Sequence, residues 1–114
     1  MRESDLVSDL INGLWPVVHL YRANAGTFRS IDGKHIVHGL PKGFSDLFGV
    51  IPKQCVADGR PMPVFLEAKI YPNRATPEQI AFLQEYRKAG CIAGVVYSVA
   101  DAWKLIDPIL KKVK

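Results

Sequence analysis

Two ionisable residues, Glu67 and Lys69, stand one position apart inside the apolar segment VFLEAKIYP, residues 64–72. In an extended strand alternate side chains share a face, so these two point the same way. Burying a charge is costly unless it is paired, hydrogen-bonded or bound to a metal ion. One explanation is a structural ion pair near the end of a strand, with the lysine reaching solvent.

A third ionisable residue, Asp46, lies in a second short apolar segment, GFSDLFGV. Aspartate is also a common turn residue, so its position alone leaves its role open. If the two segments are neighbouring strands, the carboxylates of Asp46 and Glu67 repel each other unless one is protonated or a cation lies between them. Mg²⁺ or Mn²⁺ suits such oxygen ligands, and the backbone carbonyl of Ala68 would add another. Lys69 would then lie beside an attacking water or a phosphate, which is the equipment for phosphodiester hydrolysis.

Hydrophobic periodicity and turn residues predict the elements that position these groups. The predicted helices cover residues 3–14, 77–89 and 99–107, and the predicted extended segments cover 17–24, a hairpin over 25–39 that turns at Asp32-Gly33, 44–51, 64–70 and 91–98. The second helix has a clear start, because Thr76 and Gln79 form a capping box around Pro77.

A helix between the strands at 64–70 and 91–98 predicts that these two strands are parallel. We therefore expect an α/β fold in which a mixed β-sheet is flanked by helices, in the order α-β-β-β-α-β-α. A chain of 114 residues is long enough for a single domain, and we assign 1–114 to one.

The composition is that of an ordinary globular protein, with 48% hydrophobic and 23% charged residues. The formal net charge of +4 is compatible with a polyanionic partner. No apolar run approaches the roughly 20 residues of a membrane span, and the acidic N-terminal segment MRESDLVSDL lacks the apolar centre of a signal peptide. The sequence therefore predicts a cytoplasmic protein with no membrane partner.

The pattern of Asp46 followed by Glu67-x-Lys69 resembles the PD-(D/E)xK nuclease superfamily. Five segments occur in the order seen in the VRR-NUC domain, and they resemble above all the small stand-alone proteins of phages and prophages. They are YRANAGTFR, LPKGFSDLFGV, GRPMPVFLEAK, ATPEQIAFLQ and AGCIAGVVYSVADA. The resemblance extends from about Glu3 to Trp103 and implies a restriction-endonuclease-like fold. One departure is Ser45, which stands where the superfamily motif has its proline.

The resemblance implies roles for individual residues. Asp46 and Glu67 would be metal ligands and Lys69 the catalytic lysine. Gln79 would be the glutamine near the active site, although its part in the capping box explains it equally well. Glu3 would complete the metal site, or it could simply be an acidic residue favoured in the first turn of a helix.

Four further residues are candidate DNA contacts: Arg22, Asn24, Lys42 and Ser45. Arg22 and Asn24 close the polar end of a strand face, and Lys42 lies in the loop before Asp46. Each also has an ordinary explanation as a strand-end or loop residue.

The resulting hypothesis is a Mg²⁺- or Mn²⁺-dependent, structure-selective DNA endonuclease that acts on branched DNA in the manner of a Holliday junction resolvase. Resolution needs two symmetric cuts, and a homodimer would supply two sites. Two alternatives stay open at this point: a non-catalytic DNA-binding module with the same fold, and a protein-interaction subunit in which Glu67 and Lys69 form a structural pair.

Overall fold

The computed structural model describes residues 1–23, 27–29, 33–34, 36–38 and 40–112. Helix α1, Glu3–Leu14, begins the fold. Its four buried side chains recur at helical spacing on one face, and they are Leu6, Val7, Leu10 and Leu14. This helix has the bounds that the sequence predicted.

The main sheet has four strands in the order β1-β4-β5-β6. These strands are β1, His19–Arg22; β4, Leu47–Ile51; β5, Met62–Ala68; and β6, Ile92–Val96. β4 is antiparallel to both β1 and β5, whereas β5 and β6 are parallel. Helix α2, Pro77–Lys88, connects the parallel pair, which confirms the predicted crossover.

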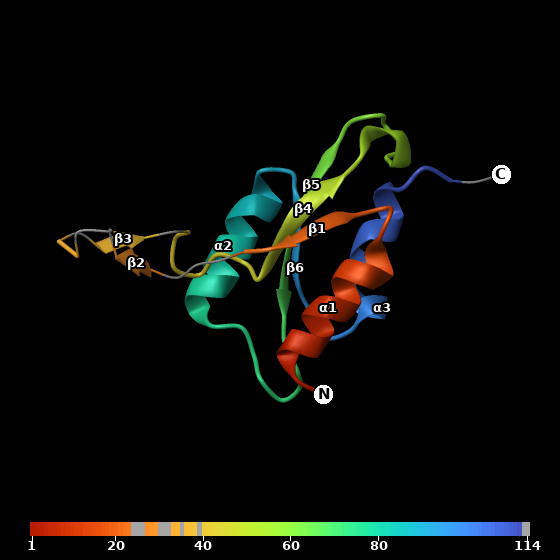
Figure 1. Ribbon diagram of the computed structural model, residues 1–114. Helices are drawn as coiled ribbons and strands as arrows, with labels where there is room; N and C mark the ends of the chain where they lie inside the picture. Colours follow the sequence, from red (N-terminus) through yellow and green to blue (C-terminus); the bar gives the residue numbers. More distant parts are fainter. Residues whose placement is uncertain (24–26, 30–32, 35, 39, 113–114) are drawn as a thin grey trace.

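Helices cover both faces of this sheet (Figure 1). Helix α1 packs on β1 and β5, and helix α3, Val99–Ile106, packs on β6 and on α1. Helix α2 packs on β5 and β6 from the other side. The sheet strands and helices follow the order α-β-β-β-α-β-α, so the predicted α/β class with a mixed sheet is confirmed.

The core lies between the sheet and the layer of α1 and α3. Its fully buried side chains come from both helices and from all four sheet strands or their immediate flanks, and they include Leu10, Leu14, Val18, Leu47, Val64, Leu66, Val96 and Ile106. These side chains anchor the strand ends that carry the candidate site. Within the described part of the chain, no helix combines the length and the apolar character needed to cross a membrane.

The predicted hairpin is present as a separate two-stranded sheet. β2, Thr27–Arg29, pairs antiparallel with β3, Ile36–His38, and neither joins the main sheet. Figure 1 shows the hairpin extending away from the body of the molecule. Gly33 has the positive φ, 73°, of a tight turn, while Asp32 of the predicted turn lies outside the described residues.

Several strand ends differ from the predicted ones by a few residues. β4 begins at Leu47, so Asp46 directly precedes the strand rather than lying within it. β5 ends at Ala68, although the Lys69 amide still donates to Val96 O at 3.1 Å. After α3 the chain continues through the short 3-10 helix Asp107–Ile109. Pro108 is compatible with this helix because it lies in the first turn, where its missing N–H would have no partner within the helix. Because β4 and β5 are antiparallel, the start of β4 and the end of β5 lie at the same end of the sheet. Asp46 and Glu67 therefore both lie at that end.

Candidate active site

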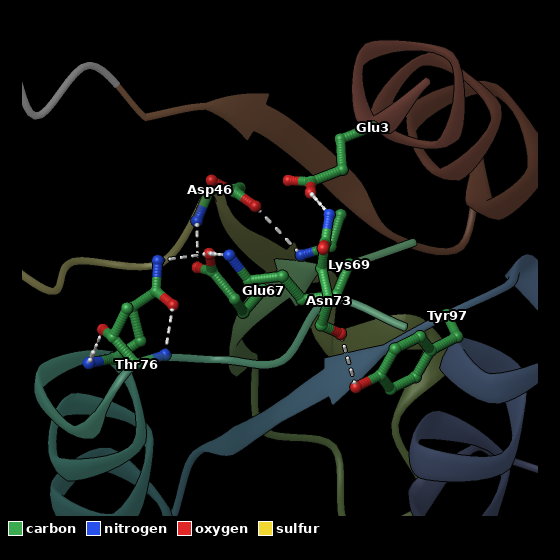
Figure 2. A network of polar contacts seen from close by, with 9 residues as sticks. Glu3, Asp46, Glu67, Lys69, Asn73, Thr76 and Tyr97 are labelled. Atoms are coloured by element: carbon green, nitrogen blue, oxygen red, sulfur yellow. Dashed lines mark hydrogen bonds and ion pairs between the residues drawn. The ribbon is translucent and has the colours of Figure 1, made fainter. Parts of the chain in front are cut away.

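The antiparallel pairing of β4 and β5 brings Asp46 and Glu67 together, because Leu47 lies opposite Leu66. The Asp46 amide donates to Glu67 Oε2 at 3.1 Å, and the Ala68 amide donates to an Asp46 carboxylate oxygen at 3.0 Å. The Glu67 carboxylate therefore accepts a hydrogen bond from the backbone of Asp46, and the Asp46 carboxylate accepts one from the residue after Glu67 (Figure 2). The convergence expected from the two apolar segments is present in the structure.

The carboxyl group of Glu67 is enclosed by the protein, with a side chain only 1% exposed. Burial and, to a smaller extent, the negative charge of Asp46 together raise its pKa to about 7. Besides the Asp46 amide, Glu67 accepts from Gln79 Nε2 at 2.8 Å. A proton or a cation would relieve the repulsion between the two carboxylates.

Lys69 lies on the same side of the strand end as Glu67, as the spacing predicted. Its ammonium nitrogen is 3.7 Å from Glu67 Oε1, and its side chain is 13% exposed. This separation allows an ion pair but is long for a hydrogen bond. The ammonium group therefore lies at the edge of the carboxylate pair with access to solvent. The carbonyl of Ala68 stays a predicted ligand.

Gln79 serves the capping box and the site at the same time. Its backbone amide donates to Thr76 Oγ1 at 3.2 Å, and its Oε1 accepts from the Thr76 amide at 2.8 Å. The remaining half of the side-chain amide, Nε2, donates to Glu67. Gln79 therefore makes the capping box and also contacts the carboxylate pair, so the start of α2 is tied directly to that pair; its role in the active site stays a prediction.

Glu3 approaches the site from the first turn of α1. Figure 2 shows it near Asp46 and Asn73, and Asn73 Nδ2 donates to Glu3 Oε2 at 3.4 Å. Glu3, Arg22 and Asp46 line a common hollow of about 250 Å³. The hydroxyl of Tyr97 donates in turn to Asn73 O at 3.2 Å.

Sequence reasoning did not single out Asn73 or Tyr97. Asn73 lies in a segment that the sequence marked only as a connection between a strand and a helix. Its partner Glu3 is 70 positions away in the chain. No local pattern signals such a contact, because it depends on how α1 packs beside the end of the sheet.

Arg22 lies where the sequence placed it, at the end of β1. One of its terminal nitrogens donates to Ser8 Oγ at 3.3 Å and to Ser4 O at 3.5 Å, which holds the guanidinium against α1 at the wall of the hollow. Asn24, predicted to contact DNA beside it, lies outside the described residues.

The structure separates Lys42 and Ser45 from this hollow. Ser45 is 1% exposed and its hydroxyl donates to Leu47 O at 2.8 Å, so a contact between its side chain and DNA is incompatible with this structure. Lys42 is exposed and lines a different hollow, together with Glu78. Gly43, which lies between Lys42 and Ser45 in the sequence, packs so closely on α2 that a Cβ at this position would lie 2.7 Å from Glu78 O.

The carboxylate pair suits a hydrated divalent cation better than a closed metal cage. Across the described ranges, no three His, Cys, Asp or Glu side chains gather closely enough to hold a metal ion by themselves. Mg²⁺ needs only one or two carboxylates, because it keeps waters and phosphate oxygens in its other positions. Asp46 lines the hollow and Glu67 lies buried directly beside it, so the two carboxylates fit this ion, and Mn²⁺ accepts the same ligands.

Comparisons with protein-family models, curated proteins and solved structures find no match to this chain.

Proposed function

We propose that this protein is a Mg²⁺- or Mn²⁺-dependent endodeoxyribonuclease that hydrolyses phosphodiester bonds in branched DNA. One observation supports the proposal above the others: Asp46, Glu67 and Lys69 converge at one end of the sheet, joined by hydrogen bonds and an ion pair. A purely structural ion pair would need Lys69 and Glu67 alone. It gives no reason to place a second carboxylate beside a buried one.

Asp46 and Glu67 would hold the cation, with the Ala68 carbonyl as a further ligand and Glu3 completing the site from α1. The bound ion would supply Lewis-acid stabilisation of a phosphate and a more acidic water. Lys69 presents a positive charge next to the carboxylate pair, where it would offset the charge that develops on the phosphate or orient the attacking water.

Gln79 would act as a positioning residue. Its Nε2 fixes one oxygen of Glu67, and its Oε1 is already occupied by the Thr76 amide. The side-chain amide cannot turn over without breaking both bonds, so Glu67 is held in one orientation. Arg22, at the wall of the hollow, would contact a DNA phosphate.

The motif resemblance to the VRR-NUC domain extends this proposal to the substrate and the assembly. It favours four-way junctions as substrates and a homodimer that supplies two sites for two cuts. The same resemblance favours a phage or prophage protein acting in the bacterial cytoplasm.

The test is cleavage of a labelled synthetic four-way junction with Mg²⁺ or Mn²⁺, and of a linear duplex of the same sequence. We expect the wild type to cut the junction. Lys69→Ala should lower the rate by roughly 100- to 1,000-fold, as removal of one charge-stabilising donor does. Asp46→Asn should abolish cleavage, because it removes a metal ligand and leaves a neutral amide.

Matched controls are Asp9→Asn and Lys104→Ala, which change exposed residues of the same types on α1 and α3. Both should retain wild-type cleavage. A wild type that binds junctions but never cuts them, with or without metal, would instead favour the non-catalytic DNA-binding module. Calorimetric titration with Mn²⁺ separates these cases further, since only the nuclease requires binding through Asp46 and Glu67.

A further inference from the structure

The connection between β5 and α2, residues 70–75, is held against the candidate site from several sides; we name it the rim loop. It starts directly after Lys69 and ends directly before Thr76, the N-cap of α2. Asn73 fixes its middle, because the side chain donates to Glu3 and the carbonyl accepts from Tyr97. Figure 1 shows this connection extending past the end of the sheet, beside the start of α1.

The rim loop nevertheless exposes a large aromatic ring. Tyr71 is 81% exposed, more than any other large hydrophobic side chain in the described ranges. Residues 71–74 are all exposed, and they include the positively charged Arg74. A fixed loop therefore presents one ring and one cation to solvent next to the site. Because the Tyr71 ring is 81% exposed, most of its surface is available for contact with a partner.

Two residues of chain span at most about 7 Å, so the backbone of Tyr71 lies within one side chain's reach of that of Lys69. A ring held there could reach a base close to the phosphate that Lys69 would face in the proposed site. Bases inside a continuous duplex are already stacked on both sides, whereas a base at a branch or an unpaired arm offers a free face.

We propose that Tyr71 stacks on a nucleobase whose face is left free at a branch point or in an unpaired arm, at the edge of the cleavage site, and that this contact selects branched over continuous duplex DNA. This inference rests on the proposed function, because it assumes that a DNA phosphate occupies the site. Arg74 in the same loop would contact the backbone and not the base, so it adds affinity without selecting a structure.

Trp15 provides a matched control for exposed aromatic surface. Its side chain is 60% exposed, and it follows the opposite end of α1 from Glu3. Twelve residues of helix separate these two ends, which corresponds to about 18 Å. Removing Trp15 therefore deletes a comparable ring at a distance from the site.

The experiment measures binding in EDTA, where no cleavage occurs, to a forked duplex with two unpaired arms and to a blunt duplex of the same paired sequence. We expect Tyr71→Ala to bind the fork roughly 5- to 100-fold more weakly and the blunt duplex unchanged, as loss of one stacked base predicts. Tyr71→Phe keeps the ring and should bind both DNAs like the wild type, as should Trp15→Ala.

A second measurement reports the stacking itself. The fluorescence of 2-aminopurine at the first unpaired position should fall when the wild type or Tyr71→Phe binds, and not when Tyr71→Ala binds. Thermal unfolding of Tyr71→Ala should match the wild type, since the replaced side chain is exposed.

Equal affinities of Tyr71→Ala and the wild type for the fork would overturn the inference. So would an equal loss on the fork and on the blunt duplex. If the wild type cuts DNA while the variants keep its preference for the fork, the inference fails and the proposed function stands. A wild type that neither binds nor cuts any of these DNAs overturns both.

Discussion

Glu67 carries a carboxyl group near the end of β5, an inner strand of the sheet, and its side chain is 1% exposed. Three groups meet its two oxygens: the Asp46 amide, the Gln79 side chain and, at 3.7 Å, the Lys69 ammonium. A second carboxylate lies beside it, so its ionisation costs free energy in the absence of a cation. This cost appears as the raised pKa of about 7.

The raised pKa predicts how stability changes with pH in the metal-free protein. The native state keeps the proton of Glu67 between pH 4.5 and about 7, and the unfolded chain loses it at the lower value. The contribution of Glu67 is therefore greatest below pH 4.5 and is lost as the pH rises through about 7. We expect a total loss of about 3 kcal/mol from this group.

Urea unfolding from pH 4.5 to 8 in EDTA checks this expectation. Glu67→Gln cannot ionise, so its stability relative to the wild type should rise across the range. Glu85→Gln, which replaces an exposed glutamate on α2, should follow the wild-type profile. A constant difference between Glu67→Gln and the wild type would show that Glu67 titrates normally.

At the scale of elements, the start of α2 is coupled to the site through Gln79. The capping box is local and stabilises the helix, while the bond from Nε2 to Glu67 links the helix to β5. Gly43 reinforces this arrangement from the loop before β4. Its positive φ of 89° and its close approach to the Glu78 carbonyl leave no space for a larger residue.

Gln79→Glu separates the two roles of this residue. Glutamate also completes a capping box, so the helix start is kept. The donor to Glu67 is lost, however, and a third negative charge enters the site. We expect this variant to be less stable than the wild type at pH 8 by about 2 kcal/mol, and by less at pH 5, where carboxylates begin to protonate.

Chemical unfolding at the two pH values measures this difference. Gln84→Glu makes the same change at an exposed position of α2 and should leave stability within about 0.5 kcal/mol. Equal effects of the two variants would mean that the contact between Gln79 and Glu67 contributes nothing to the fold.

At the scale of the whole molecule, the hairpin of β2 and β3 is separate from the four-stranded sheet. The backbone contact from the Ala23 amide to Asp46 O, 2.8 Å, joins the two chain segments at the base of the hairpin. The strand pairing of the main sheet therefore does not include β2 or β3.

Replacing residues 27–38 with a Gly-Ser linker of equal length tests this separation. We expect the free energy of unfolding to change by no more than about 1 kcal/mol, because a loop of similar length closes the same ends at little entropic cost. Urea unfolding followed by tryptophan fluorescence measures it. A loss of several kcal/mol would mean that the hairpin stabilises the main sheet.

The elements followed from local signals in the sequence. The apolar stripe of α1, the capping box at Thr76 and the helix between two apolar strands each lie within a short stretch of chain, where periodicity and caps determine structure. The approach of Asp46 to Glu67 was predicted only on the condition that their two segments are neighbouring strands, and the pairing of β4 with β5 meets that condition.

Contacts between distant segments were decided only by the tertiary structure. The sequence placed Ser45 and Lys42 beside Asp46, yet the fold buries Ser45 and turns Lys42 toward α2. It also joined Asn73 to Glu3 across 70 positions. Local patterns determine which face a side chain takes within its own element. The packing of helices and strands determines which faces meet, and that depends on the whole core at once.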